Sequence, residues 1–331
     1  MGVKFGLIAS HQYPFDDDLR QRLEELFELT ELAAELGYDS VFAINHFVSN
    51  LATPQPISMM GPLLERSGEM QVGTGILLLP LFNPVHIAEE FATLDQLYPG
   101  RVILGVGAGY REHEFEALGV SMERRGARLG EEVELIRRLW SGEEVDFEGD
   151  FYRLQGQRIG VRPHTEGGPP IWIGAGAKNA VRRAARLGDA WYAPGNSPKR
   201  GYLERTLALH DEELLAAGKS REGREYPVGV ELFCAPTTEL AVERAMPFAR
   251  REYHTYAEYP ALRWQRDRFD ELVAHTLMLG SPEDLFERLR HFEELGVNHV
   301  IFRPFWLGMP IEMARESLQL FAREVMPGFK D

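Results

Sequence analysis

The fold is decided by residues 70–106, which read MQVGTGILLLPLFNPVHIAEEFATLDQLYPGRVILGV. A buried parallel strand shows in a sequence as a short apolar run, and its crossover helix has apolar residues at a period near 3.6. Residues 70–79 and 101–106 are such runs, and residues 84–97 between them have the helical period, with Pro84 near the helix start. The stretch therefore predicts one strand–helix–strand unit of a parallel sheet.

The same alternation continues from this unit toward both ends of the chain. Further helices are expected at 19–36, 57–66, 122–140, 177–187 and 311–326. The eight predicted strands are 3–9, 40–44, 70–79, 101–106, 170–173, 189–192, 227–233 and 297–302. Eight strands alternating with helices predict an α/β fold of the (β/α)8 TIM-barrel type. An open doubly wound sheet is the alternative, but eight units over this length close more naturally into a barrel.

Residues 1–331 are predicted to form a single barrel domain with insertions, the main ones after the fourth and seventh strands. Residues 141–168 include a run, 145–154, with the apolar alternation and central turn residues of a β-hairpin. Residues 194–226 and 250–280 contain stretches that fit neither the strand nor the helix pattern. Long insertions after barrel strands usually cover the active site, so we expect these segments to act as lids and to choose the substrate.

The chain has 331 residues with 51 acidic and 36 basic side chains, which gives a formal net charge of −15. Such a surface repels phosphate backbones and anionic lipid headgroups, so neither nucleic acid nor a membrane is an expected partner. No apolar run approaches the roughly 20 residues needed to span a bilayer. The one cysteine, Cys234, cannot form an internal disulfide. These features predict a cytoplasmic protein.

The predicted strand ends carry mostly glycine, apolar and aromatic residues, and barrel active sites lie at these ends. Only His11, His46 and Glu231 are suitable metal ligands there, without a His-x-His pair, so no metal site is predicted and a metal-dependent hydrolase is disfavoured. Glycines let a backbone approach a ligand closely, which suits a large flat molecule. His46, with its neighbour Asn45, is the candidate for acid–base catalysis or substrate contact.

Residues 174–178, Gly-Ala-Gly-Ala-Lys, run from a predicted strand directly into a helix. Their backbone N–H groups, the positive helix end and Lys178 predict a phosphate-binding loop, with an ordinary tight turn as the alternative. The glycines at 105, 107 and 109 do not have the spacing of a dinucleotide-binding fingerprint, so an NAD site of that kind is disfavoured.

The sequence resembles the bacterial luciferase-like family of flavin- and F420-dependent barrel oxidoreductases over nearly its whole length. The residues that carry the resemblance are 36–42 with 46–47, 72–76 with 80 and 83–85, 88–97 with 100–101, 105–109 with 114–115 and 118–119, 170–175, and 320–321 with 325–327. The resemblance implies reduced FMN, or alternatively F420, lying against the end of the third strand. It also implies a non-proline cis peptide near Gly75-Ile76.

The resemblance further implies a set of site residues. His46 matches a histidine that lines the substrate side of the ring, and Asn45 stands where an acidic residue or histidine is common. Ala108 stands where flavin-dependent relatives often have a basic residue; either Arg111 replaces that residue, or its loss points to F420. The predicted cofactor-binding residues are Thr74, Gly75, Ile76, Gly107, Ala108, Gly109, Tyr110, Arg111, Gly174, Ala175, Gly176, Ala177 and Lys178.

The resulting hypothesis is a monooxygenase that uses reduced FMN and O2 to oxidise a small organic molecule, with a separate flavin reductase as a partner. The alternatives are an F420-dependent oxidoreductase that transfers a hydride without O2, and a non-catalytic flavoprotein or partner subunit. Phe5, Trp172 and Phe302 are expected to wall the pocket, and family relatives imply a homodimer. The predicted catalytic residues are His46 and Asn45, and the predicted substrate pocket contains His11, Phe233, Arg303, Phe305 and Trp306.

Overall fold

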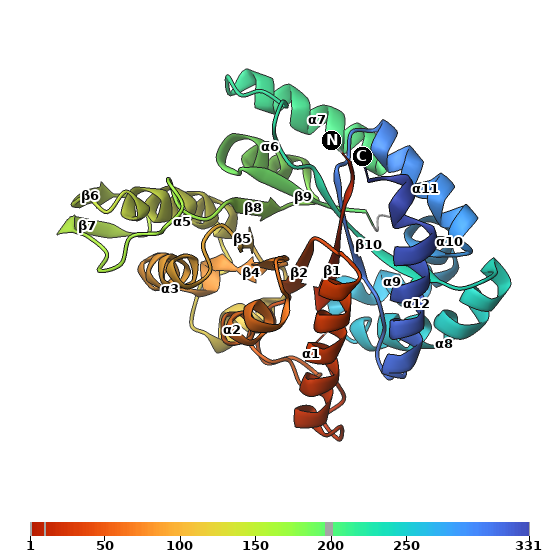
Figure 1. Cartoon of the computed structure of the whole chain (residues 1–331). Helices are drawn as coiled ribbons and strands as arrows, with labels where there is room; N and C mark the ends of the chain where they lie inside the picture. The colour runs from red at the N-terminus through yellow and green to blue at the C-terminus, as the bar shows by residue number, and fades with distance from the viewer. Residues whose placement is uncertain (1, 10, 196–200, 331) are drawn as a thin grey trace.

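The chain folds into a closed parallel barrel surrounded by helices (Figure 1). The computed structural model describes residues 2–9, 11–195 and 201–330, so Ser10 and residues 196–200 of the predicted 194–226 insertion lie outside the described residues. Neighbouring strands pair in parallel in the order β1, β2, β3, β5, β8, β9, β10, β12 and back to β1, which confirms the (β/α)8 barrel. These strands are β1 (Lys4–Ala9), β2 (Ser40–Ala43), β3 (Gln71–Thr74), β5 (Val102–Gly107), β8 (Ile171–Gly174), β9 (Ala190–Pro194), β10 (Pro227–Cys234) and β12 (His299–Arg303).

The helices agree with the sequence pattern at six positions, and six further helices of the described residues were not predicted, three of them in or next to the 250–280 insertion described below. The expected ones are α1 (Leu19–Glu35), α2 (Pro56–Arg66), α3 (Pro84–Leu97), α5 (Arg125–Trp140), α6 (Lys178–Leu187) and α12 (Ile311–Glu324). The other three are α4 (Glu112–Ala117), α7 (Tyr202–Ala216) and α11 (Pro282–Glu294). A start signal for α11 was present, because Ser281 Oγ accepts a hydrogen bond from the Asp284 backbone N at 3.2 Å and Pro282 takes the first helical position.

Two of the predicted insertions contain helices or strands. The hairpin of β6 (Val145–Glu148) and β7 (Arg153–Gln157) is confirmed and extends away from the barrel (Figure 1). Residues 250–280 form the end of α8 (Thr238–Tyr256), then α9 (Arg263–Asp267), α10 (Phe269–Thr276) and β11 (Leu277–Gly280). Strand β11 was not predicted, and it pairs in parallel with the last residues of β10.

The predicted strand 70–79 is interrupted at the point where the resemblance implied a cis peptide. Strand β3 ends at Thr74, the Gly75-Ile76 peptide bond is cis, and β4 (Leu77–Leu78) pairs with the end of β5. The neighbouring strand leaves room for this bulge. A Cβ atom on Gly105 would lie 1.9 Å from the Thr74 carbonyl oxygen, and one on Gly107 would lie 1.9 Å from Cδ1 of Ile76. Packing against the bulge therefore accounts for two glycines of β5.

Side chains fill the inside of the barrel. Phe42 stacks on Trp172 with 5.2 Å between ring centres, in a cluster that also contains Ile103, Tyr192 and Ile301. Two aromatic residues expected in the pocket lie elsewhere. Phe5 and Phe302 contact Phe321 of α12, with ring centres 5.3 and 5.2 Å apart, so they pack between the barrel and its outer helices.

A polar network closes the amino-terminal end of the barrel. Ser40 Oγ lies 2.7 Å from His299 Nε2, and His299 Nδ1 lies 3.1 Å from Glu225 Oε2. Lys4 also contacts Glu225. Burial alone would raise the pKa of Glu225, but His299 and Lys4 lower it to about 2. Ser40 and His299 are fully buried, so we interpret this network as structural.

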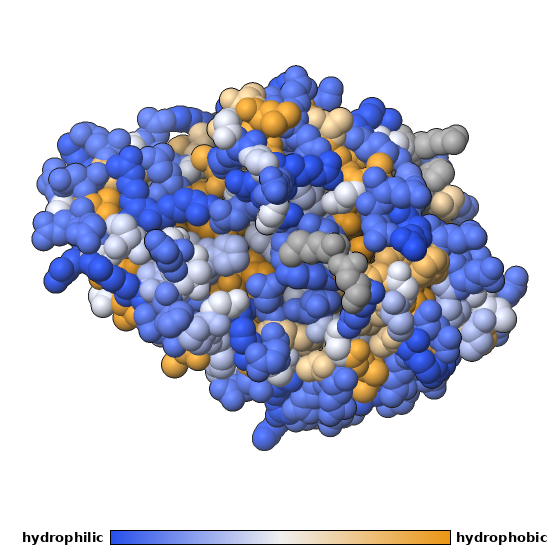
Figure 2. Space-filling view, turned by 45° about the horizontal axis from the view of Figure 1, so that its top comes forward, coloured by the Kyte–Doolittle hydropathy of each residue, from blue (hydrophilic) through white to orange (hydrophobic). Residues whose placement is uncertain are grey.

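The outer surface shown in Figure 2 is mainly hydrophilic, with hydrophobic residues in separate patches. The two chain ends meet, since the Val3 backbone N donates to the Phe329 carbonyl at 3.0 Å. Within the described ranges, no helix has both the length and the apolar character needed to cross a membrane. The homodimer stays a prediction.

Candidate functional site

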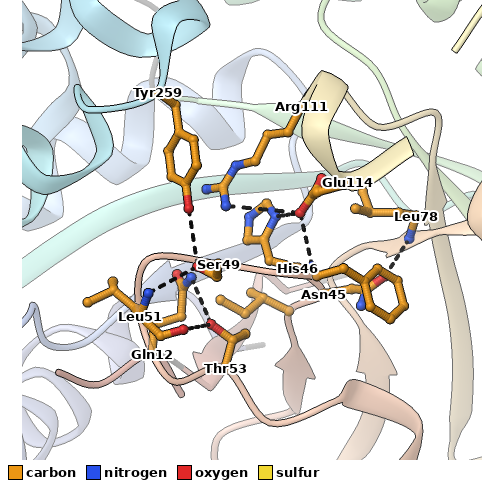
Figure 3. Close-up of polar contacts among 12 residues, drawn as sticks. Gln12, Asn45, His46, Ser49, Leu51, Thr53, Leu78, Arg111, Glu114 and Tyr259 are labelled. Atoms are coloured by element: carbon orange, nitrogen blue, oxygen red, sulfur yellow. Dashed lines mark hydrogen bonds and ion pairs between the residues drawn. The ribbon is translucent and has the colours of Figure 1, made fainter. Parts of the chain in front are cut away.

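A histidine–carboxylate pair lies at the carboxyl-terminal mouth of the barrel. His46 follows β2, and its Nδ1 lies 2.9 Å from Oε1 of Glu114 in α4 (Figure 3). The same oxygen accepts a hydrogen bond from the Phe47 backbone N at 3.0 Å. The Glu114 side chain is fully buried, whereas the His46 side chain is 14% exposed. The pair therefore connects the loops after β2 and β5 and leaves His46 in partial contact with the mouth.

The contacts of His46 assign separate roles to its two ring nitrogens. A carboxylate only accepts hydrogen bonds, so a neutral His46 carries its proton on Nδ1 and Nε2 is the acceptor. Burial lowers the pKa of His46; the Glu114 hydrogen bond raises it, and the positive charges of Arg111 and Arg303 lower it further. The arrangement therefore favours a neutral imidazole that can accept a proton at Nε2.

Asn45, the second predicted catalytic residue, has both ends of its amide engaged. Its Oδ1 accepts from the Leu78 backbone N at 3.0 Å, and its Nδ2 donates to Gln55 Oε1 at 3.0 Å. Gln55 in turn donates to the His46 carbonyl at 3.0 Å. Asn45 is 2% exposed, so its contacts support a role in holding the His46 loop against the segment after the bulge.

The predicted ring-binding residues lie together around the bulge. Thr74 is fully buried and its Oγ1 donates to the Gly105 carbonyl at 2.6 Å, while Gly75 and Ile76 are half-buried. Gly107 is buried, and Ala108 and Gly109 are half-buried. Tyr110 is 40% exposed, and its ring lies edge-on to His46 with 6.2 Å between ring centres. The structure thus places an apolar bulge and an aromatic ring beside His46.

The predicted phosphate loop joins β8 to α6. Gly174 is half-buried and Ala175 is buried, whereas Gly176, Ala177 and Lys178 are exposed. Ala177 is the N-cap residue of α6 and has no side chain that caps the helix, so the first N–H groups of α6 remain available to a ligand. These exposed groups fit a phosphate, which both FMN and F420 carry.

Two arginines not predicted from the sequence lie beside this loop region. Arg125 Nε donates to the Gly109 carbonyl at 3.0 Å. Arg183 of α6 lies against Gly126, where a Cβ atom would be 2.5 Å from its Nη2. Burial, and then the charges of Arg186 and Arg125, lower the pKa of Arg183. In the part of the chain that the structure describes, neither Arg125 nor Arg183 forms an ion pair with a carboxylate, so both suit an anionic ligand.

The side chain of Arg111 is directed toward Glu114 and the predicted lid segment. Its guanidinium is buried, its Nη1 lies 4.0 Å from Glu114 Oε1, and its Cζ lies 3.9 Å from the centre of the Tyr259 ring. Arg111 is therefore engaged by Glu114 and by the predicted lid segment. Arg125, which contacts Gly109, is a second basic residue close to Ala108.

Three of the predicted substrate-pocket residues line one open cleft. Arg303 at the end of β12, Phe305 and Trp306 share this cleft with Gln12 and Glu252. Arg303 forms an ion pair with Glu252 and lies 3.9 Å from Glu231 Oε1, while Trp306 Nε1 donates to Glu231 Oε2 at 2.7 Å. Tyr256 from the predicted lid contacts Gln12 and accepts from Arg303 Nη1 at 3.4 Å. The lid segment thus lies over the barrel mouth.

The other two predicted pocket residues do not line this cleft. His11 is fully buried, with Nδ1 2.6 Å from the Ala9 carbonyl and Nε2 3.1 Å from the Ile44 carbonyl. Burial lowers its pKa to about 4. Phe233 is fully buried and packs in the core near Trp306. Among the described residues, no group of three or more histidine, cysteine, aspartate or glutamate side chains has the arrangement of a metal site.

Comparison with known proteins decides the family. The sequence model of the family described as luciferase-like monooxygenase matches residues 3–299. The chain belongs to this family. Within it, the chain is 30% identical over 320 residues to the F420-dependent glucose-6-phosphate dehydrogenase of Mycobacterium tuberculosis, covering 92% of this chain and 93% of that protein. The luciferase-like chain is therefore an oxidoreductase.

Two solved monooxygenase structures have the same fold as this chain. The monooxygenase RslO1 of Streptomyces bottropensis superposes with a TM-score of 0.89 at 26% identity, covering 99% of this chain and 100% of that one. The oxygenating constituent of 3,6-diketocamphane monooxygenase of Pseudomonas putida, solved with FMN, gives a TM-score of 0.83 at 20% identity, covering 99% of both chains. The second likeness supports the fold alone.

The residues that sequence reasoning missed are mostly partners of predicted ones. Glu114 was noted only as part of the family resemblance, although a carboxylate shortly after β5, two strands from β2 in the barrel, was a signal for a partner of His46. Tyr259 lies in a segment without a periodic pattern, 145 residues beyond Glu114 in sequence, and carried no such signal. Arg125 and Arg183 lie in helices that have many other arginines.

Proposed function

We propose that this chain is an F420-dependent oxidoreductase that interconverts an alcohol and a carbonyl compound by hydride transfer without O2. The observation that carries the proposal is the contact between His46 Nδ1 and Glu114 Oε1 at the barrel mouth. Oxidation of an alcohol requires a group that accepts the hydroxyl proton, and this pair supplies one. The 30% identity to an F420-dependent dehydrogenase over almost the whole chain also supports this function.

The roles of the residues follow from their contacts. When bound, oxidised F420 would supply the hydride acceptor for the carbinol carbon, a two-electron step that needs no O2. Nε2 of His46 accepts the hydroxyl proton, and Glu114 stabilises the imidazolium that results. Lys178, Arg125, Arg183 and the first turn of α6 would hold the cofactor phosphate. The half-buried Gly75 and Ile76 and the ring of Tyr110 offer apolar surface for the cofactor ring.

The second candidate is a monooxygenase that uses reduced FMN. The TM-score of 0.89 and 26% identity to a solved monooxygenase favour it. The phosphate-binding groups serve FMN and F420 equally, so they do not separate the two candidates.

A paired experiment separates them. The protein is titrated with F420 and with FMN, each oxidised and reduced, and binding is followed by fluorescence. Turnover of F420 is then measured without O2 on a panel of alcohols that includes glucose 6-phosphate. Tighter binding of F420 and O2-independent turnover are expected. Turnover only with reduced FMN and O2 would overturn the proposal. His86→Gln on the exposed side of α3 is the matched control for His46→Gln.

A further inference from the structure

The hydroxyl of Tyr259 fastens the segment after α8 to the loop that carries His46. It accepts a hydrogen bond from the Asn50 backbone N at 2.8 Å and donates one to Asn50 Oδ1 at 2.8 Å. Asn50 Nδ2 returns to the same segment, donating to Glu258 Oε2 at 2.7 Å and to the Thr255 carbonyl at 3.3 Å. Two backbone segments far apart in sequence are therefore joined four residues beyond His46.

The ring of Tyr259 contacts the other loop of the site, the one that carries Glu114. Arg111 Cζ lies 3.9 Å from its centre, a cation–π distance. The His113 ring stacks on it with 5.2 Å between centres and 5° between planes. Figure 3 shows Tyr259 beside Arg111, with His46 and Glu114 next to that guanidinium. One side chain thus touches both loops that bring the histidine and the carboxylate together.

Arg111 depends on these contacts for its position. Its side chain is 1% exposed, and its Nε and Nη1 have no hydrogen-bond partner among the described residues. Besides its interactions with the Tyr110 side chain, whose ring centre lies 5.6 Å away, Arg111 is held by the Tyr259 ring and by the 4.0 Å approach to Glu114. Removing the Tyr259 ring would allow the buried Arg111 guanidinium, which now faces the Glu114 carboxylate, to move.

We propose that Tyr259 is a positioning residue for His46. By holding Asn50 on one loop and Arg111 on the other, it keeps the Glu114 carboxylate against Nδ1, so that Nε2 is the proton-accepting nitrogen. The use of Nε2 in catalysis rests on the proposed function, whereas the positioning is a property of the protein alone. The titratable and charged groups around His46 are Glu114 and Arg111, Arg303 of β12, His11 after β1, and Tyr110.

The test reads His46 directly, without any cofactor. Histidine nitrogens are labelled with ¹⁵N, the His46 signals are assigned by their loss in His46→Gln, and the tautomer and titration are measured by NMR. The wild-type protein is expected to hold the Nδ1–H tautomer. In Tyr259→Leu, His46 should move toward the Nε2–H tautomer that a free imidazole prefers in water. Tyr259→Phe keeps the ring on Arg111 but loses the hydrogen bonds of the hydroxyl to Asn50 and Ser49, so an intermediate tautomer ratio is expected.

Tyr226→Phe is the matched control, because Tyr226 also combines a hydroxyl hydrogen bond with a cation–π contact, and it lies at the opposite end of the barrel. Its hydroxyl donates to Asp211 Oδ1 at 2.8 Å, and Arg221 Cζ lies 4.4 Å from its ring centre. This variant should leave the His46 spectrum unchanged. An unchanged His46 tautomer and titration in Tyr259→Leu would show that the proposal is wrong.

A second variant keeps the test decisive if Tyr259→Leu does not fold. Asn50→Ala removes the side-chain half of the contact and leaves the ring of Tyr259 in place; a partial shift of the His46 tautomer supports the proposal, and no shift overturns it. If the proposed function also holds, Tyr259→Leu should lower kcat at least about 10-fold with little change in F420 affinity. Failure of the proposed function would show instead as absent turnover in the wild-type protein, and it would leave the NMR result intact.

Discussion

Glu114 Oε1 lies 2.9 Å from His46 Nδ1 although 68 residues separate the two in sequence. The contact joins the loops after β2 and β5, whose strands are separated in the barrel only by β3. Because the carboxylate is fully buried and also accepts from the Phe47 backbone N, it fixes both the ring and the start of its loop.

Glu114→Ala is expected to lower turnover about 100-fold, because the variant loses the carboxylate that orients the His46 ring and stabilises its protonated form. Steady-state kinetics with F420 and an alcohol substrate measure this. Glu116→Ala, an exposed change on the same helix, is the control and should behave like the wild type. Equal activity of the two variants would contradict a role for the pair.

The pH dependence of kcat/KM reports the charge of His46. Burial lowers its pKa below the ordinary 6.5, and a general base must be neutral, so activity should fall only when the pH drops below that lowered pKa. Arg111→Gln removes a nearby positive charge that lowers the pKa. The acid limb of the profile should therefore move to higher pH in this variant. A limb that stays in place, or moves to lower pH, would be inconsistent with His46 as the base.

The sequence predicted the barrel well because each strand has a local signature, a short apolar run, and most of the strands are followed by a helix with a recognisable period. It also placed His46, since that residue directly follows such a run. The partners of His46 could not be placed in the same way. Glu114 and Tyr259 contact the site through loop geometry, and no local pattern records which loop residues meet. Residues 277–280 form β11 by pairing with β10. This pairing depends on the tertiary structure, and a run of four residues does not predict it.

Cofactor affinity tests the phosphate loop separately from the chemistry. Lys178→Ala and Arg183→Ala should each weaken the binding of both F420 and FMN by about 10-fold, because each removes one charge-assisted contact. Fluorescence titration measures the two dissociation constants. Arg186→Ala changes an exposed arginine on the same helix and should bind as the wild type does. If only Arg186→Ala weakened binding, the phosphate would lie elsewhere.

Two alanine substitutions distinguish the role of the β5 glycines. In Gly105→Ala the new Cβ would lie 1.9 Å from a backbone oxygen of Thr74, which has little freedom to move. In Gly107→Ala it would meet the tip of the Ile76 side chain, which can rotate away. Gly105→Ala should therefore reduce the free energy of unfolding by about 1–3 kcal/mol or more, and Gly107→Ala by less. Denaturant unfolding monitored by circular dichroism measures both; the reverse order would refute the packing account of the bulge.

Glu132 offers a test of stability against pH away from the site. It is fully buried in α5, its Oε1 accepts from the Tyr152 hydroxyl at 2.6 Å, and burial raises its pKa to about 8. Below pH 4.5 both the folded and unfolded chains hold the proton. Between pH 4.5 and 8 only the folded chain holds it, so the stability that this group contributes falls as the pH rises and levels off above 8.

Glu132→Gln keeps a neutral hydrogen-bond acceptor at this position and removes the titration. The variant should therefore gain stability relative to the wild type as the pH rises from 5 to 8, with a difference above about 1 kcal/mol at pH 8. Denaturant unfolding at each pH measures the difference. Glu134→Gln changes an exposed carboxylate of the same helix, and its difference from the wild type should be nearly independent of pH. Parallel pH curves for Glu132→Gln and the wild type would mean that Glu132 is ionised in the folded protein and that the hairpin contact of Tyr152 is made to a charge.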